Sequence, residues 1–150
     1  MTKIKIYDKI ILSSNIIERK YIMIIAESNQ DKYSTQVSNG TSSIIIDTMS
    51  DKGGSGDYFR PHDLLCAGYA SCLNITVRMI LEKMNLKYDK VITKVDIDRD
   101  KEDSTTFLYH VEIIGDIDTF KKNAVIALAS NCPVKKTLSK NIEFKASSDL

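Results

Sequence analysis

The sequence predicts a single domain of the α+β class. The segment before Gly53 has the pattern of short strands, a long apolar run begins at Pro61, and alternating strand patterns and a second helix occupy the rest. Strands, helix, strands, helix and a last strand, in that order, are typical of α+β folds. A chain of 150 residues with 43% hydrophobic residues can bury roughly two-thirds of its unfolded surface, so residues 1–150 are expected to form one domain.

Three short segments before Gly53 predict an antiparallel meander. Residues 21–27, 32–38 and 42–48 are rich in β-branched and aromatic residues, and the turn signals SNQD and NG separate them. Residues 1–20 are ambiguous, because IKIYDKIIL fits a strand and NIIERKY fits one or two helical turns. This N-terminal extension receives no functional assignment.

A long buried helix is predicted to start at Pro61, after the loop SDKGGSGDYFRP. Proline suits the first helical turn, and Asp63 favours the positive end of the helix. Residues 64–81 are apolar or small on almost every side, which is typical of a buried helix, so we expect a central helix wrapped by sheet. Its length also fits a membrane span, but Asn74 and Arg78 inside the window favour a core helix.

The second half of the chain predicts a hairpin, two helices and a last strand. Residues 90–98 alternate, as do those of TTFLYHVEIIG, and the polar stretch DRDKEDST joins the two strands. A second helix is expected over residues 119–130. Its predicted apolar stripe consists of Ala124, Val125, Leu128 and Ala129. Pro133 then opens a short helical turn, and residues 141–146 are expected to form the last strand.

The net charge and the N-terminal sequence indicate which partners and which cellular compartment to expect. The net charge of +1, from 21 basic and 20 acidic residues, gives no field that favours nucleic acid or an anionic membrane, and a small or neutral ligand fits better. The N-terminal MTKIKIYDKI lacks the apolar core of a signal peptide, so a cytoplasmic protein is expected. Thiols are kept reduced there, and with three cysteines any disulfide is expected to be transient.

Two of the three cysteines, Cys72 and Cys132, are candidates for a reactive thiol. Cys132 directly precedes Pro133, which keeps it out of the helical region and places it beside free backbone N–H groups, with Lys135 and Lys136 near. These neighbours predict that Cys132 is the more acidic thiol. Cys72 lies inside the long helix, where burial alone would make it an inert core residue.

Cys66 is expected to be a core residue. It precedes Cys72 by six residues, which rotates it roughly 120° away around the helix, so the two thiols cannot easily share a pocket.

Other classes of site find little support in the sequence. His62 is interpreted as a neighbour of the helix start and His110 as an outward residue on a strand. Neither a C-x-x-C pair nor a close histidine pair is present, so no metal site is expected. Ser71 lacks the G-x-S-x-G elbow of serine hydrolases, and the glycines of DKGGSGDYF match no phosphate-binding loop.

Two motifs hold these cysteines: RPHDLLCAGYASCLNITVRMILEKMNL, with Cys72, and NCPVKKTLSKNIEF, with Cys132, which stands 132 − 72 = 60 positions later. On these motifs, the sequence from about residue 33 onward resembles the OsmC/Ohr family of thiol-dependent peroxidases. This resemblance implies antiparallel sheets wrapped around two central helices in an intertwined homodimer, with active sites at the subunit interface.

The resemblance also implies a two-cysteine cycle that needs no cofactor and no metal. Cys72 attacks an organic hydroperoxide and becomes a sulfenic acid, Cys132 condenses with it to a disulfide, and a dithiol reductant reopens the pair. In the family a glutamate near the start of the central helix holds an arginine that activates the attacking thiol. Asp63 is the nearest acidic match, and it could act through a helix kink at Gly68 or through a cation between the two.

The sequence allows more than one residue as the cation that activates Cys72, and more than one function for the protein. No arginine stands between Arg19 and Arg60, so either of these, or a lysine, is a candidate for the cation. The alternative function is a non-catalytic relative that binds a small hydrophobic molecule at the dimer interface or acts as a redox sensor.

Overall fold

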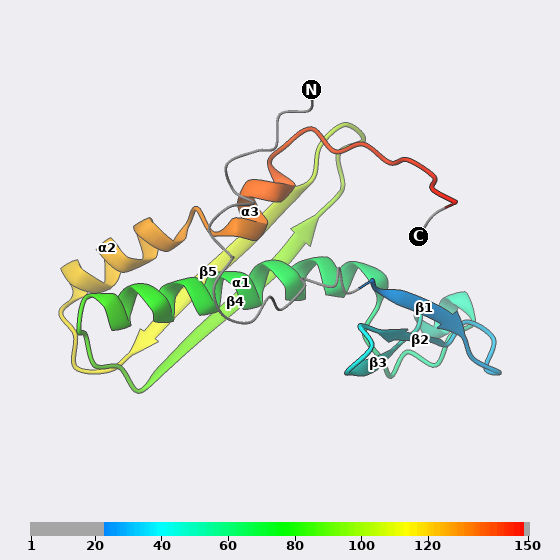
Figure 1. Cartoon of the computed structure of the whole chain (residues 1–150), viewed down its shortest axis with the longest axis horizontal. Helices are drawn as coiled ribbons and strands as arrows, with labels where there is room; N and C mark the ends of the chain where they lie inside the picture. Colours follow the sequence, from blue (N-terminus) through cyan, green and yellow to red (C-terminus); the bar gives the residue numbers. More distant parts are fainter. Residues whose placement is uncertain (1–22, 149–150) are drawn as a thin grey trace, which may run out of the picture.

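The computed structural model of the protein describes residues 23–148. The ambiguous segment 1–20 and the beginning of the first predicted strand lie outside these residues. The described elements form in the predicted α+β order (Figure 1). They are β1 (Ile25–Ser28), β2 (Thr35–Ser38), β3 (Ser43–Ile46), a 3-10 turn η2 (Ser50–Lys52), α1 (Pro61–Lys83), β4 (Lys90–Asp98), β5 (Thr106–Ile114), α2 (Thr119–Ala129) and α3 (Pro133–Leu138).

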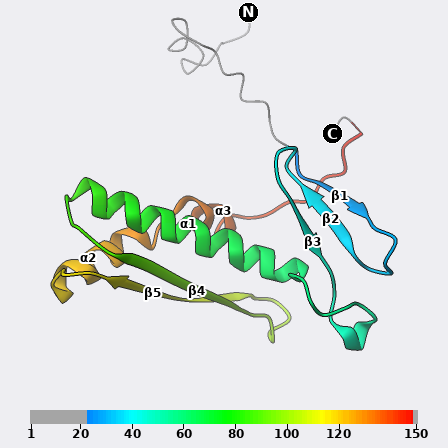
Figure 2. The same ribbon diagram turned by 90° about the horizontal axis from the view of Figure 1, so that it is seen from below.

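The first sheet is the predicted antiparallel meander, with the strand order β1-β2-β3. Asn39 closes the turn between β2 and β3, because its Oδ1 accepts the backbone N–H groups of Thr41 and Ser42 at 3.0 and 2.8 Å. Gly40 supplies the positive φ of 87° that this turn needs. The three strands contact one another far more than any other element, and the sheet lies beyond the N-terminal end of α1 (Figures 1 and 2).

The second sheet is the predicted hairpin of β4 and β5, joined in register with Val91 opposite Ile113 and Val95 opposite Tyr109. Val91, Val111 and Ile113 are buried beneath α1, which lies across one face of the hairpin (Figure 2). A hydrogen bond from Thr93 Oγ1 to the carbonyl of Ala70, at 3.0 Å, ties β4 to α1. His110 is exposed, as the alternation predicted.

Helix α1 begins at Pro61 as predicted, but only one of its faces is buried. Tyr69, Leu73, Val77 and Leu81 recur every four residues and form the centre of the core. The prediction of burial on all sides is therefore wrong for a single chain. The large apolar side chains that this helix exposes are Leu65, Ile75 and Met79.

Helix α1 is also the one helix among residues 23–148 that is long and apolar enough to cross a membrane by length and composition. The core helices of soluble proteins meet the same criterion, so the finding is weak evidence for a membrane span.

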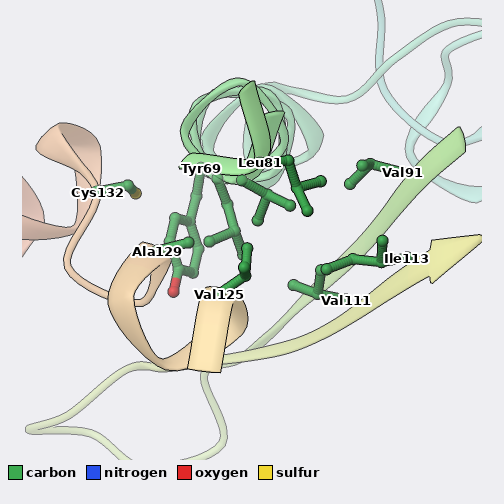
Figure 3. Packing of buried hydrophobic residues seen from close by; sticks show 10 residues of the cluster. Tyr69, Leu81, Val91, Val111, Ile113, Val125, Ala129 and Cys132 are labelled. Atoms are coloured by element: carbon green, nitrogen blue, oxygen red, sulfur yellow. The ribbon is translucent and has the colours of Figure 1, made fainter. Parts of the chain in front are cut away.

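Helices α2 and α3 pack along α1 and complete the core (Figures 1 and 3). Val125 and Ala129 of α2 are buried in it as predicted, whereas Leu128 is 63% exposed, so that part of the predicted stripe is wrong. Residue 128 follows Val125 by three positions, and the helix turns this position away from α1.

The predicted last strand does not form. Residues 141–146 follow α3 without regular structure, and Phe144 is 95% exposed. An alternating sequence becomes a strand only where a neighbouring strand supplies hydrogen-bond partners, and this segment runs beside none in Figure 1. The prediction is therefore wrong for the single chain.

Candidate functional site

The structure brings Cys72 and Cys132 together at the contact between α1 and the start of α3. Cys132 is fully buried, with 0% of its surface exposed, and Cys72 is half-buried against the same apolar cluster. The two side chains lie within hydrogen-bonding reach of each other. Sixty residues separate them in sequence, so only the packing of α3 on α1 makes this pair.

Cys132 occupies the break between α2 and α3 that its proline neighbour predicted. Its backbone lies outside the helical region, with φ −58° and ψ 157°, and it occupies the N-cap position of α3 without a side-chain capping hydrogen bond. The backbone N–H groups of Lys135 and Val134 interact with its sulfur, as expected at a helix start.

Burial nevertheless raises the pKa of the Cys132 thiol above its ordinary value. The neighbouring thiol of Cys72 also raises it, and the N–H groups of Lys135 and Val134 lower it by less than burial raises it. The prediction that Cys132 is an acidic thiol is therefore wrong, because desolvation outweighs the helix start. At neutral pH Cys132 is therefore a protonated thiol beside the thiol of Cys72.

Asp63 holds Arg60 at the start of α1. The carboxylate accepts the backbone N–H of Arg60 at 2.8 Å and pairs with the guanidinium, with 2.7 Å between Nη2 and Oδ1 and 3.0 Å between Nε and Oδ2. The hydrogen bonds from the Arg60 side chain are the main reason why the pKa of Asp63 is lowered. An arginine held by a carboxylate near the helix start is thus present in this chain.

The Arg60–Asp63 pair does not reach Cys72 within the chain. Helix α1 runs without interruption from Pro61 to Lys83, so Gly68 introduces no kink. Nine residues of helix place Asp63 roughly 13 Å from Cys72 along the axis and on the opposite face. A catalytic role for Asp63 remains a prediction.

Cys66 is the thiol that lies near Arg60 and Asp63. It lines a cavity of about 970 Å³ together with Lys94, Arg99 and other residues of α1 and β4. Burial raises the pKa of Cys66, the carboxylates of Asp96 and Asp63 raise it further, and Arg60 lowers it. Cys66 and Cys72 have separate surroundings, as their spacing on the helix predicted.

A second cavity of about 820 Å³ lies on the other side of the helix start. Its walls are mainly apolar, and His62, Arg99 and Lys135 are among the residues that line it. Arg99 Nη1 donates to His62 Nε2 at 3.0 Å on the exposed rim, so the imidazole contacts the loop after β4.

Sequence reasoning missed Tyr69, which lines the second cavity and packs in the same cluster as Cys132 (Figure 3). Its ring meets Phe107 and Tyr109 edge-on, with centroids 5.9 and 5.7 Å apart. Burial raises its pKa to about 12, with smaller contributions from Tyr109 and Cys132. The signal in the sequence was its position three residues before Cys72, which places both on neighbouring turns.

Among residues 23–148, no three histidine, cysteine, aspartate or glutamate side chains gather in a way that could hold a metal ion. The chemistry available to the site in the described residues is that of two adjacent thiols.

Fold and site define the class of this protein as an α+β protein with a thiol pair between its long helix and a short helix near the C-terminus. Residues 54–147 match the family model described as OsmC-like protein. The chain therefore belongs to the OsmC/Ohr family. No curated protein matches the sequence.

Solved structures share the fold at low sequence identity. An OsmC-like protein from Mycoplasma pneumoniae superposes with a TM-score of 0.67 and 22% identity, over 80% of this chain and 88% of the other. The organic hydroperoxide resistance protein OsmC from Legionella pneumophila gives 0.57 and 21%, over 79% and 90%. The organic hydroperoxide resistance protein OhrB of Bacillus subtilis gives 0.56 and 18%, also over 79% and 90%. These similarities establish the fold.

Proposed function

We propose that this protein is a thiol-dependent peroxidase that reduces organic hydroperoxides to alcohols. The Cys72 thiolate attacks the terminal oxygen of the hydroperoxide, the O–O bond breaks, and the alcohol leaves after taking up a proton. Cys72 is then a sulfenic acid. The sulfur of Cys132 attacks it, water leaves, and a Cys72–Cys132 disulfide remains. A dithiol reductant restores both thiols by exchange.

The observation that carries this proposal is that the Cys72 and Cys132 side chains pack in the same apolar cluster, close enough for each thiol to influence the other. A sulfenic acid on Cys72 would form beside the second thiol, so condensation needs no large movement of the chain. Cys66 lines a cavity that neither Cys72 nor Cys132 lines, so it cannot compete for this step without rearrangement. Membership of a family that includes organic hydroperoxide resistance proteins supports the same reaction.

The same proposal includes a role for Asp63, a location in the cytoplasm and assembly into a homodimer. Asp63 would act by holding Arg60, and this arginine could reach a Cys72 only if a second subunit brings it there. A reducing cytoplasm would supply the dithiol reductant. The apolar side chains that α1 exposes in the single chain support a homodimer packed on this helix.

A second function is favoured by one observation. The cavity of about 820 Å³ has apolar walls and includes neither Cys72 nor Cys132, which fits a protein that binds a small hydrophobic molecule and uses its thiols for packing or slow redox sensing.

The experiment that tests the peroxidase starts from the fully reduced protein. It is mixed with a modest excess of an alkyl hydroperoxide, quenched with a thiol-blocking reagent, and mapped by peptide mass spectrometry. We expect rapid formation of a Cys72–Cys132 disulfide with Cys66 still free. Three free thiols after many minutes would exclude the peroxidase and leave the binding function.

Two variants complete this test. Cys72→Ser should abolish hydroperoxide turnover, whereas Cys66→Ser is the matched control on the same helix and should retain it. A binder would keep its affinity for an apolar ligand in both variants. Turnover that survives in Cys72→Ser would contradict the assignment of the attacking thiol.

A further inference from the structure

The two sulfurs of the proposed disulfide differ in how far a second molecule can reach them. In the single chain Cys132 has no exposed surface, and a second copy packed on α1 would not uncover it. Cys72 lies on α1 at the edge of the cluster and is partly exposed in the single chain, and in the proposed dimer it must stay open to the hydroperoxide. Thiol–disulfide exchange requires an attacking thiolate to approach one sulfur along the axis of the S–S bond. Accessibility therefore decides which sulfur is attacked.

The backbone of Cys132 is also held in place from both sides. Its N–H donates to the carbonyl of Ala129 at 3.1 Å, and its own carbonyl accepts the N–H of Lys136 at 3.1 Å. Its side chain packs in the cluster that contains Tyr69 and Val125 (Figure 3). Exposing its sulfur would require opening of the contact between α3 and α1.

We propose that the reductant attacks the sulfur of Cys72 and that the buried sulfur of Cys132 is the leaving group. The incoming thiolate forms a bond to Cys72, the Cys72–Cys132 bond breaks, and its electron pair leaves with Cys132. The second thiol of a dithiol reductant then attacks this mixed disulfide and releases Cys72, so two electrons and two protons restore both thiols. This inference rests on the proposed Cys72–Cys132 pair.

The surroundings of Cys132 suit a transient leaving group. An anion in a buried position is unfavourable, which by itself would slow the departure. The backbone N–H groups of Val134 and Lys135 interact with this sulfur and offset part of that cost. Once released, the buried sulfur takes up a proton, so it does not attack the mixed disulfide as readily as a free thiolate would.

The test uses the Cys66→Ser protein, oxidised with diamide to form the Cys72–Cys132 disulfide without any peroxide. The disulfide is treated briefly with 2-mercaptoethanol, quenched in acid, and the peptides are mapped. We expect the mercaptoethanol adduct on Cys72 in at least about ten-fold excess over Cys132. An equal distribution, an excess on Cys132, or failure of diamide to form the disulfide would overturn the inference.

The same reaction in concentrated urea is the control, because unfolding exposes both sulfurs. There the ratio should fall toward one; a ratio unchanged by unfolding would mean that burial is not its cause and would also overturn the inference. The outcome is separate from that of the hydroperoxide experiment. A protein that ignores hydroperoxides but gives the Cys72 adduct after diamide would lose the proposed function and retain this inference.

Discussion

At the scale of single residues, Cys132 shows how two local effects compete. Its position before Pro133 placed it at the start of a helix, where N–H groups favour a thiolate, and the sequence predicted this position correctly. Its burial depends on packing against α1, including Tyr69, which lies 132 − 69 = 63 positions earlier in the chain. The residues next to Cys132 in the sequence do not reveal this burial, and the loss of hydration that burial causes decides the direction in which the pKa of Cys132 shifts.

The raised pKa of Cys132 predicts slow alkylation. In a Cys66→Ser, Cys72→Ser protein, which keeps the burial, the reaction of Cys132 with iodoacetamide should be slow at about pH 8 and accelerate only above the ordinary pKa of 9.0. The same titration in urea should return to the ordinary value. If the rate of alkylation had its pH midpoint in the folded protein at or below the midpoint in urea, the raised pKa of Cys132 would be contradicted.

The sign of the effect on stability follows from the same shift. A group whose folded pKa is raised contributes its stability fully below the unfolded pKa and loses it as the pH rises through the folded pKa. The contribution of Cys132 to the free energy of unfolding should therefore be constant up to about pH 8 and fall above about pH 9.

Tyr69 should titrate apart from the other tyrosines. Burial raises its pKa to about 12, whereas an unperturbed tyrosine ionises near about 10. The measurement is the ultraviolet absorbance of tyrosinate during an alkaline titration of the wild type and of Tyr69→Phe, which keeps the aromatic ring. Their difference should appear only above the main transition, and a difference at the main transition would show that the phenol is exposed.

At the scale of elements, the start of α1 depends on Asp63. Asp63→Ala removes the acceptor of the Arg60 N–H and the partner of the guanidinium, and it should lower the free energy of unfolding by about 1 kcal/mol. Urea unfolding measures this loss. Asp118→Ala is the matched control, because Asp118 caps α2 by accepting the N–H of Lys121 at 2.9 Å and lies outside the proposed site.

The two variants also separate a structural from a catalytic Asp63. If the carboxylate holds an activating arginine, hydroperoxide turnover should fall in Asp63→Ala and not in Asp118→Ala. Equal turnover in both variants would show that Asp63 only stabilises the start of α1.

The elements that were predicted correctly carry their own local signals. Proline starts α1 and α3, Asp118 caps α2, and strict alternation marks β4 and β5. The failures depend on contacts that local sequence does not contain. Residues 141–146 alternate like a strand but lie beside no partner strand within residues 23–148. Leu128 is apolar like a core residue, but it is exposed in this part of the chain.

For the site, the residues alone identified two unusual cysteines, and the family resemblance joined them as a pair. Their contact arises where α3 packs against α1, a tertiary contact that neither spacing nor periodicity specifies. Tyr69 was not predicted as a site residue because an aromatic residue on an apolar helix is typical of an ordinary hydrophobic core.

At the scale of the whole molecule, the single chain leaves much apolar surface without cover. Met79 is 63% exposed, and Leu65 and Ile75 lie exposed on the same helix. Among the described residues, the β1-β2-β3 sheet contacts little else, and the segment 141–146 pairs with no strand. Large apolar side chains exposed along one helix are typical of an interface between chains, and we expect a second copy to cover them.

This expectation predicts that Met79→Glu weakens a dimer. A carboxylate on the exposed apolar side of α1 would have to lose its hydration in an interface packed on this helix, which is unfavourable for an unpaired charge. Analytical ultracentrifugation of the wild type should give twice the 16.9 kDa mass of the chain, and Met79→Glu should shift the distribution toward the monomer.

Lys83→Glu is the matched control, because it adds the same carboxylate to an exposed position in the last turn of α1, outside the apolar side chains. It should remain dimeric. A wild-type protein that sediments as a monomer at micromolar concentration would contradict the homodimer and require Leu65, Ile75 and Met79 to be exposed for another reason. A Met79→Glu protein as dimeric as the control would place the interface elsewhere, on the β1-β2-β3 sheet or on residues 141–146.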